Sequence, residues 1–408
     1  MNSMKGIPAI RFNCFEGEWT LSKLDDVADF YDELRKPITE SARESGPYPY
    51  YGASGIIDYV KDYIFDEEMI LLSEDGANIL DRNYRVCFLA SGKYWVNNHA
   101  HVVKAKRGNN NFFICESLER LRYDKYNTGT AQPKINQDVC KKLPLYTTSN
   151  DEQTAIGNYF QKLDSLIKQH QQKHDKLSHL KKAMLEKMFP KQGETVPEIR
   201  FKGFSGEWKE KFFGACFANV PNNTLSRAEL NYRVGLAKNI HYGDVLIKFG
   251  ETLDADSELI PFITNNEVVN KLKHTALQSG DIVIADAAED NTVGKCTELL
   301  NVGELLVFSG LHTIAVRATL PFASKYLGYY LNSASYHDQL SSLMQGTKVL
   351  SISKTAIQNT LVVFPKNVEE QTAIGNYFQK LDTLINQHQQ QITKLTNIKQ
   401  ACLSKMFI

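Results

Sequence analysis

Apolar residues recur at alternating steps of four and three along two stretches of the chain, residues 151–189 and 369–407. Neither stretch contains a proline, and both are rich in strong helix formers. This narrow apolar repeat predicts a long helix with a coiled-coil seam rather than the wider stripe of a surface helix. The predicted seam residues are Ile156, Phe160, Leu163, Ile167, His170, Leu177, Ile374, Phe378, Leu381, Ile385, His388 and Leu395. At 1.5 Å per residue, each helix is about 60 Å long.

The two stretches are copies of one another. Aligned without gaps, 27 of their 39 positions are identical, which establishes an internal repeat. Each copy begins with a helix-capping signal: Ser149 with Glu152 three residues on, and Asn367 with Glu370. Pro190 ends the first helix.

A shorter motif also occurs twice, once before each large region. Residues 7–12 (IPAIRF) and 17–19 (GEW) return as residues 196–201 (VPEIRF) and 206–208 (GEW). We call these the framing motifs. The regions that follow them differ, with 132 residues between Trp19 and Glu152 and 161 between Trp208 and Glu370. The chain therefore has a constant frame that carries two different globular domains.

We predict four segments. Residues 1–148 hold the first framing motif and globular domain, 149–190 the first long helix, 191–366 a linker with the second motif and domain, and 367–408 the second long helix. Both globular domains have an α+β pattern. The first has expected strands at 69–73, 85–90, 101–104 and 112–115 and a helix at 118–126. The second has expected strands at 244–249, 281–285, 305–308 and 313–317 and helices at 324–331 and 335–344.

Two similar helices with apolar seams can bury these seams against each other, as an intramolecular coiled coil. We expect antiparallel packing, which relates the two halves by a pseudo-twofold axis, although the connections also permit a parallel pair. His170 and His388 interrupt the seams at the same register, at the midpoint of each repeat. An antiparallel pair brings these positions together, and polar seam residues can fix a register. The alternative is that both histidines are half-exposed and specify nothing.

Composition suits a soluble protein of two or more domains. The chain has 408 residues, 42% hydrophobic and 23% charged, and no run of 18 apolar residues. The first residues lack the apolar core of a signal peptide. Seven scattered cysteines, an odd number without a CxxC pair, indicate reduced thiols and a cytoplasmic protein.

Net charge is zero, but charge is unevenly distributed in the first half. Residues 20–80 carry 5 Lys/Arg against 14 Asp/Glu, and residues 81–142 carry 12 against 5. Aromatic residues interleave with the basic ones, as on a DNA-binding surface. An equally good alternative is that the basic segment neutralises the acidic one. Residues 209–365 show no basic excess, with 13 positive against 15 negative charges.

Sequence motifs for catalysis are missing. The chain has no phosphate-binding GxxxxGK[ST] loop, no GxGxxG, no GxSxG and no Asn-Pro-Pro-aromatic segment of the adenine methyltransferases. His99-Ala100-His101 offers two imidazoles, but without a third ligand a structural or DNA-facing role is favoured over a metal site. The acidic run at residues 286–290 is interpreted as a solvated turn after a strand.

Several motifs together resemble the specificity (S) subunits of type I restriction-modification systems, over essentially the whole length. They are the two EQTAIGNYFQKLD helices, the framing motifs ending in GEW, PYYGASGIIDYV and SEDGANI in the first domain, and GTAQPKIN (129–136) and GTKVLSIS (346–353) before the long helices. The doubled layout is the specific part of the resemblance. The second domain departs from expectation because it lacks net basic charge.

The resemblance implies a non-catalytic DNA-binding subunit. Each globular region would be a target recognition domain that reads one half of a split double-stranded DNA target, and the helices would set the gap and dock two methyltransferase subunits. Restriction/translocase subunits would join for cleavage. S-adenosylmethionine, ATP and Mg are expected in those partners and not in this chain. Competing hypotheses are a coiled-coil scaffold that binds only proteins and an enzyme with an unrecognised site.

Candidate DNA contacts are polar or aromatic residues in loops and in the basic segment. In the first domain they are Tyr48, Tyr50, Tyr51, Ser54, Lys93, Asn97, Asn98, His99, Lys104, Arg107 and Gln132. In the second they are Lys248, Asn291, Lys295, Gln345, Lys348 and Ser351. For each residue an ordinary role in the fold is an equally good interpretation.

Overall fold

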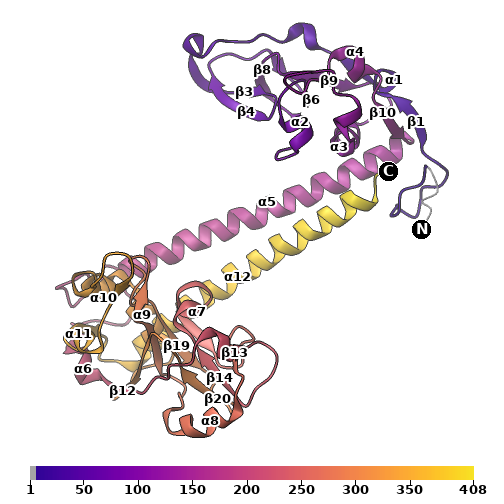
Figure 1. Ribbon diagram of the computed structural model, residues 1–408. Coiled ribbons are helices and arrows are strands. Elements are labelled where there is room, and N and C mark those ends of the chain that lie inside the picture. The colour runs from indigo at the N-terminus through magenta and orange to yellow at the C-terminus, as the bar shows by residue number, and fades with distance from the viewer. Residues whose placement is uncertain (1–5) are drawn as a thin grey trace. The chain divides into compact units, whose positions relative to one another are not determined.

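The computed structural model describes residues 6–408 (Figure 1). They form two compact units. The first consists of the chain up to His170 together with Gln391–Ile408, and the second consists of Gln171–Gln390. Both unit boundaries fall inside long helices, α5 (Asn150–Lys187) and α12 (Val368–Lys405). Each unit therefore contains one globular domain and part of each long helix.

Between residue 6 and the start of α5, the first unit has ten strands and several short helices. The strands are β1 (Thr20–Lys23), β2 (Ala28–Phe30), β3 (Ser45–Gly52), β4 (Gly55–Val60), β5 (Phe65–Asp66), β6 (Met69–Ser73), β7 (Cys87–Ala90), β8 (Lys93–Val96), β9 (Ala100–Ala105) and β10 (Pro144–Thr147). The helices are α1 (Leu24–Val27), α2 (Asn78–Asp81), α3 (Asn111–Arg120) and α4 (Gln137–Lys141). Short 3₁₀ turns cover residues 32–34, 40–42 and 123–125.

The second unit has a longer series of elements between α5 and α12. The strands are β11 (Lys209–Phe212), β12 (Phe217–Val220), β13 (Leu230–Asn231), β14 (Ala237–Ile240), β15 (Thr252–Asp254), β16 (Phe262–Ile263), β17 (Ile282–Ala285), β18 (Ala287–Ala288), β19 (Cys296–Leu300), β20 (Leu306–Ser309), β21 (Thr313–Ala318), β22 (Leu350–Ser351) and β23 (Leu361–Phe364). The helices are α6 (Phe213–Cys216), α7 (Tyr242–Ile247), α8 (Asn266–Leu272), α9 (Tyr326–Asn332), α10 (Ala334–His337) and α11 (Lys354–Gln358), with 3₁₀ turns at 227–229, 273–275 and 338–343.

The two domains share a sheet topology that their sequences do not reveal. The first domain has a sheet of order β2-β9-β6-β7 and the second one of order β12-β21-β17-β19-β15. Each domain also has a second sheet, β4-β3-β8-β5 or β13-β16-β14-β20, that contains one parallel pair. This pair is β3 with β8 in the middle of the first and β14 with β20 at the edge of the second. Strands β1 and β10 pair in the first unit as β11 and β23 pair in the second. The predicted α+β class is therefore correct for both domains.

The central strands β6 and β17 are apolar throughout because both of their faces are covered. In β6, Ile70 and Leu72 join one core cluster, and Leu71 joins another with Val102 on the opposite face. In β17, residues 282 and 284 face one cluster and residues 283 and 285 face another. A strand buried on both faces loses the alternating pattern of a half-exposed one. An apolar run of only five residues is typical of such a buried strand, and the strand predicted at 69–73 coincides with β6.

Side-chain caps begin both long helices, as predicted. The Ser149 hydroxyl accepts a hydrogen bond from the Glu152 backbone N–H at 3.3 Å, and the Asn367 side-chain oxygen accepts one from the Glu369 N–H at 2.7 Å. The glutamates do not complete a capping box. The carboxylates of Glu152 and Glu370 instead bind arginines of the framing motifs.

The framing motifs form the same junction in both units. Arg11 donates from Nε and Nη2 to the Glu152 carboxylate at 2.6 and 2.7 Å, and Arg200 donates in the same way to Glu370 at 2.6 and 2.8 Å. Both carboxylates are buried, and both arginines are mostly covered. The hydrogen bond to Glu152 also raises the pKa of Arg11. A bidentate pair of this kind fixes the angle between motif and helix as well as the distance.

Each junction also contains the far end of the other long helix. In the first unit, the Ile10 N–H donates to the Lys405 carbonyl of α12 at 2.9 Å. In the second, the Ile199 N–H donates to the Lys187 carbonyl of α5 at 2.8 Å. The start of one long helix, the end of the other and one framing motif are therefore held together in each unit.

Within the first unit, α5 and α12 pack antiparallel. The Tyr159 hydroxyl lies 3.6 Å from Cys402 Sγ, and Asp164 forms an ion pair with Lys399. As the residue number rises along α5, it falls along α12. The seam residues Ile156, Phe160 and Leu163 are buried in one apolar cluster with Met406 and Phe407 of the chain's last segment.

The second unit repeats this direction with equivalent residues. Lys181 forms an ion pair with Asp382 at 2.6 Å, and the Phe189 and Phe378 rings stack with centroids 5.8 Å apart. Asp164 and Asp382 are equivalent positions of the repeat, as are Lys399 and Lys181. The expected antiparallel direction is thus observed inside each unit. His170 and His388 lie next to the unit boundaries, and their role in register stays a prediction.

Two predicted strands are wrong. The apolar run 112–115 lies in α3, where the Asn110 side chain caps the helix by accepting the Phe113 N–H at 3.1 Å. The run looks like a strand because this helix is buried on most sides, with Phe112 stacked on Phe160 of α5. Apolar runs of this length do not separate strand from buried helix.

The predicted strand at 244–249 is mainly helix α7. His241 caps it by accepting the Gly243 N–H on its Nδ1 at 3.2 Å. The predicted helices at 118–126 and 335–344 each resolve into a short α-helical segment followed by a 3₁₀ turn. The remaining predicted strands at 85–90, 101–104, 281–285, 305–308 and 313–317, and the helix at 324–331, are found with ends shifted by one or two residues.

Candidate nucleic-acid interface

In the first domain, four loops meet at one edge of the two sheets. We call residues 51–55, 74–77, 97–99 and 129–134 the first loop edge. The Asn97 N–H donates to the Tyr51 carbonyl at 3.0 Å, and the Gly76 N–H donates to the Pro133 carbonyl at 3.0 Å. The Ser73 hydroxyl donates to the Ala53 carbonyl at 2.5 Å. These bonds tie the loops that follow β3, β6 and β8 to the GTAQPKIN segment.

The second domain builds an equivalent edge from residues 240–243, 286–292, 310–312 and 345–351, the second loop edge. The Gly310 N–H donates to the Ile240 carbonyl at 2.8 Å, as Asn97 does to Tyr51 in the first domain. The Ile352 N–H donates to the Asp286 carbonyl at 2.9 Å. Strands β18 and β22 pair at this edge, which joins the acidic run to the GTKVLSIS segment.

A cavity of about 630 Å³ opens on the second loop edge. Its lining combines one face of α7, the acidic loop and the GTKVLSIS segment: Tyr242, Gly243, Leu246, Ile247, Ala287, Ala288, Glu289, Asp290, Thr292, His312 and Val349. Glu289 and Asp290 are exposed, as expected for a solvated turn, but Ala287 and Ala288 are buried in β18. The interpretation of this run as a solvated turn is therefore correct only for its last two residues. Burial raises the pKa of Asp286, partly offset by its contact with the His312 ring.

Part of the predicted contact set is brought together on these edges. Ser54, Asn98, His99 and Gln132 lie on the first loop edge with exposed side chains. Asn291, Gln345, Lys348 and Ser351 are exposed on the second. Asn97 also lies on the first edge but is buried, and its side-chain oxygen accepts the His99 N–H at 2.8 Å. Its position indicates a role in shaping the loop.

Other predicted contacts lie elsewhere or are occupied. Tyr50 is buried, and its hydroxyl accepts the Ile38 N–H at 2.9 Å, so its role is in the core. Tyr51 is half-buried and stacks on Phe88. Lys295 donates to the Leu246 carbonyl at 2.8 Å.

Tyr48 and Lys93 lie at the far end of the sheet. Lys93 begins β8 and Tyr48 lies midway along its parallel partner β3, and both side chains contact Tyr63. The first loop edge follows the ends of these strands. Four residues of strand separate the two places by about 13 Å. Lys248 in the second domain bonds to the Tyr232 hydroxyl at 2.7 Å and pairs with Asp244 at 3.0 Å.

Two lysines of the basic segment of the first domain are paired with acidic groups. Lys104 pairs with Glu67 and Lys106 with Asp29, both from the acidic segment before it. Arg107 is exposed. Of the two interpretations of this charge pattern, the structure favours internal neutralisation for Lys104 and Lys106.

His101 belongs to a buried charged cluster and not to a pair with His99. Its Nδ1 lies 2.6 Å from the Asp32 carboxylate and its Nε2 lies 2.8 Å from the Ile135 carbonyl. Asp32, Glu74 and His101 place potential metal-ligand atoms within 4.8 Å of one another. Arg35 and Lys134 already neutralise Glu74, at 2.6 and 3.1 Å. With both ring nitrogens used and two cations present, this cluster does not suit a metal ion.

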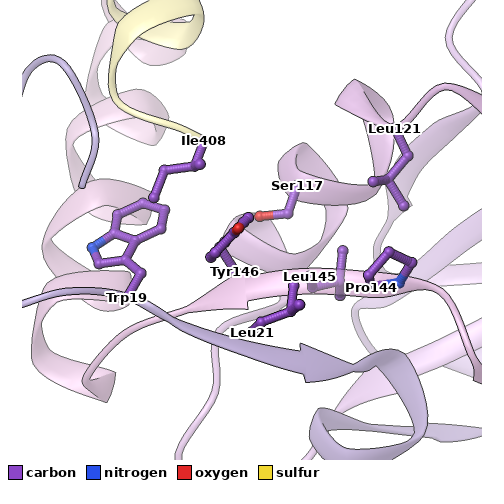
Figure 2. Close-up of a pocket in the computed structure, with 8 residues that line it drawn as sticks. All are labelled: Trp19, Leu21, Ser117, Leu121, Pro144, Leu145, Tyr146 and Ile408. Carbon is purple, nitrogen blue, oxygen red and sulfur yellow. The ribbon is translucent and has the colours of Figure 1, made fainter. Parts of the chain in front are cut away.

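A smaller cavity of about 290 Å³ lies in the frame of the first unit (Figure 2). Its lining comes from β1, β10, α3 and the end of the chain: Trp19, Leu21, Ser117, Leu121, Pro144, Leu145, Tyr146 and Ile408. Figure 2 shows Trp19 and Ile408 beside one another at one side of it. This lining is mainly apolar and belongs to the junction, so it offers little for contact with DNA.

Comparison with known proteins identifies the family. Residues 16–179 and 238–397 each match the type I restriction modification DNA specificity domain. The chain belongs to this family. The two matches fall on the two halves that the internal repeat defines, so the family resemblance predicted from the sequence is confirmed.

Curated relatives carry matching descriptions. A putative type I restriction enzyme specificity subunit of Haemophilus influenzae is 36% identical over 151 residues, 37% of this chain and 38% of that one. The EcoprrI specificity subunit of Escherichia coli is 30% identical over 129 residues, 32% and 31%. The chain thus spans less than two fifths of the length of either relative. The MjaVIII specificity subunit of Methanocaldococcus jannaschii is 21% identical over 389 residues, 90% and 87%.

The fold is shared with a solved type I S subunit. The crystal structure of the S subunit from M. genitalium superposes with a TM-score of 0.60 over 98% of this chain and 99% of that one, at 15% sequence identity. Among residues 6–408 no helix combines the length and apolar character needed to cross a bilayer.

Proposed function

We propose that this chain is the DNA sequence-specificity subunit of a type I restriction-modification complex, in which each globular domain reads one half of a bipartite DNA target. The observation that carries the proposal is the contrast between frame and edge. The junctions repeat residue for residue, whereas the two loop edges share a topology and differ in their exposed side chains. Two readers of different sequences on one scaffold need this combination.

The loop edges have the chemistry of base readers. Sequence is read by polar side chains at base edges, and contacts to phosphates mainly position the protein. Exposed Asn, Gln, Ser, Lys and His side chains gather there on loops that the sheets hold in place. Because few free basic groups surround them, we expect most phosphate contacts to come from partner subunits.

The long helices would set the gap between the half-sites. In proteins that read two half-sites, the spacing follows from protein geometry. Each helix spans 38 residues, or about 57 Å at 1.5 Å per residue. We propose that the frame docks two methyltransferase subunits and, for cleavage, restriction subunits in the cytoplasm. S-adenosylmethionine, ATP and Mg would be bound by those partners, because methylation and ATP-driven cleavage would be theirs.

Adenine-methylation mapping of the host genome by single-molecule sequencing tests the proposal. Deleting this gene should remove methylation at one split motif with a fixed gap. An unchanged methylome in cells with an active methyltransferase partner would favour a protein-binding scaffold instead.

Exchange of one domain tests the assignment of half-sites. Replacing residues 20–148 with the equivalent region of a relative, with Trp19 and Glu152 retained so that the junction still forms, should change one half of the motif only. Replacing residues 209–366 is the matched experiment and should change the other half. A change in both halves, or in the gap, would contradict separate readers.

A further inference from the structure

One histidine occupies the same place on both loop edges. His99 directly precedes β9 and His312 directly precedes β21. Each of these strands pairs antiparallel with the central strand of its sheet, Ile70 with Val103 and Ile282 with Val316. The next backbone contacts also match, since the carbonyl of His99 accepts the Glu74 N–H at 2.9 Å and that of His312 accepts the Asp286 N–H at 3.1 Å.

A carboxylate holds each of these rings by the same nitrogen. His99 Nδ1 lies 2.9 Å from both carboxylate oxygens of Asp75, and His312 Nδ1 lies 3.3 Å from one oxygen of Asp286. The carboxylates come from loop positions that are not equivalent, Asp75 two residues after β6 and Asp286 one residue after β17. The two domains thus place a carboxylate beside the same histidine from different loop positions.

This arrangement determines which ring nitrogen is available. The hydrogen bond of His99 and the 3.3 Å contact of His312 favour the proton of a neutral ring on Nδ1, which leaves Nε2 as an acceptor. Among the described residues no hydrogen bond reaches Nε2 of either ring. The side chains are 50% and 53% exposed, against 21% and 26% for their carboxylate partners. A half-exposed acceptor nitrogen, held by a carboxylate that is more covered than the ring itself, is suited to a donor from a bound molecule.

The neighbourhood of both rings limits their motion. The Asn97 side chain fixes the backbone of His99, and the Tyr242 ring meets the His312 ring edge-on with centroids 5.3 Å apart. His312 has a positive φ of 54°, a conformation that a glycine adopts more easily. Non-glycine residues held in such conformations occur often at functional sites.

We propose that His99 and His312 are specificity-determining residues, one for each half of the DNA target, and that Nε2 of each accepts a hydrogen bond from an exocyclic amino group in the major groove. Adenine N6 and cytosine N4 present such donors there. Asp75 and Asp286 are positioning residues that keep the acceptor nitrogen outward. The inference rests on the proposed function and specifies which side chains carry the reading.

The test is the methylome of cells that carry His99→Ala or His312→Ala in the full chain with its methyltransferase partner. His99→Ala should relax one base position in one half of the motif and leave the other half and the gap unchanged. His312→Ala should do the same in the other half. Discrimination at the affected position should fall roughly tenfold, since the position loses one hydrogen bond to a base. His274→Ala, at an exposed histidine outside the second loop edge, is the control and should leave the motif intact.

The outcomes separate this inference from the proposed function. If deletion of the gene removes a split motif but both alanine variants methylate the unchanged motif, the inference is wrong and the proposed function stands. If deletion removes no motif, both fail. If an alanine variant abolishes methylation, His99→Gln or His312→Gln decides: a changed base at one position supports the inference, and an unchanged motif overturns it. Asp75→Asn and Asp286→Asn should relax the same positions by a smaller factor.

Discussion

The junction of the first unit and that of the second are built from the same residues in the same roles. Arg11 binds Glu152 as Arg200 binds Glu370, and Phe160 packs beside Phe407 as Phe378 packs beside Phe189. The loop edges also share a topology, and an exposed histidine precedes β9 in one and β21 in the other, but most of their other exposed side chains differ. The difference shows which contacts must be kept for a common frame and which are free to vary.

The largest effects are expected from the aromatic residues of the frame. Phe160→Ala and Phe378→Ala should each destabilise their own unit by about 3–5 kcal/mol, because both rings are fully buried and leave a cavity. Hydrogen exchange of the long-helix amides measures each unit separately. Phe212→Ala is the control, since that ring is 60% exposed, and it should change little. A large loss from one of the two core substitutions without the other would show that the frames are not energetically equivalent.

Next in size are the buried ion pairs that tie framing motif to helix. Glu152→Gln and Glu370→Gln should each cost about 3 kcal/mol, because an arginine is left in a covered site without its counter-charge. Thermal unfolding followed by hydrogen exchange checks the size and the location of the loss. Combining Glu370→Gln with Arg200→Met should recover part of it. Glu198→Gln, which removes an exposed ion pair with Lys187, should have no measurable effect.

A third change exploits a difference between the domains. At the position of the buried His101, the second domain has Ile314, so the charged cluster around Asp32 occurs in the first domain only. Burial opposes ionisation of Asp32, but hydrogen bonds from His101 and the Val102 N–H outweigh it and hold its pKa below the usual 3.8. Asp32→Asn should therefore cost about 2 kcal/mol at neutral pH.

The same cluster predicts that the first unit becomes less stable at acid pH. A carboxylate with a lowered pKa stabilises the fold above its unfolded pKa, and this contribution is lost as pH falls through the folded pKa. The amides of β6 and β9 should lose protection from hydrogen exchange as the pH falls below about 4. Asp32→Asn should make this loss less dependent on pH. Glu74 adds to the effect, since its pKa is also lowered. If the variant lost protection at acid pH as much as the parent protein does, other titrating groups would be responsible for the loss.

The frame could be predicted from the sequence because its signals are local and occur twice. The repeated heptad-like spacing gave both helices, and Ser149 and Asn367 marked their starts. Antiparallel packing followed from having two similar seams in one chain. The frame's closest contacts were not predictable, because the partners of Glu152 and Glu370 lie 141 and 170 residues away in the chain.

The loop edges were harder to predict for physical reasons. The apolar runs of α3 and α7 have strand-like composition because tertiary burial on several sides overrides periodicity. Charge counts suggested a basic surface, but Lys104 and Lys106 are used internally. His312 was missed because nothing in the sequence GLHT marks it as special. It can be identified by aligning the start of β9, at the end of NNHA, with the start of β21, at the end of GLHT. That alignment requires knowledge of the sheet topology.

One consequence of the unit boundaries concerns the order in which the chain is made. The first unit needs Gln391–Ile408 to cover Phe160, Phe113 and Trp19. The ribosome must therefore add the 238 residues that follow His170 before this unit can fold completely. At roughly 5–20 residues per second the nascent first domain keeps that aromatic surface uncovered for about 12–48 s. Chaperone demand during synthesis should thus be greater for the half of the protein that is translated first.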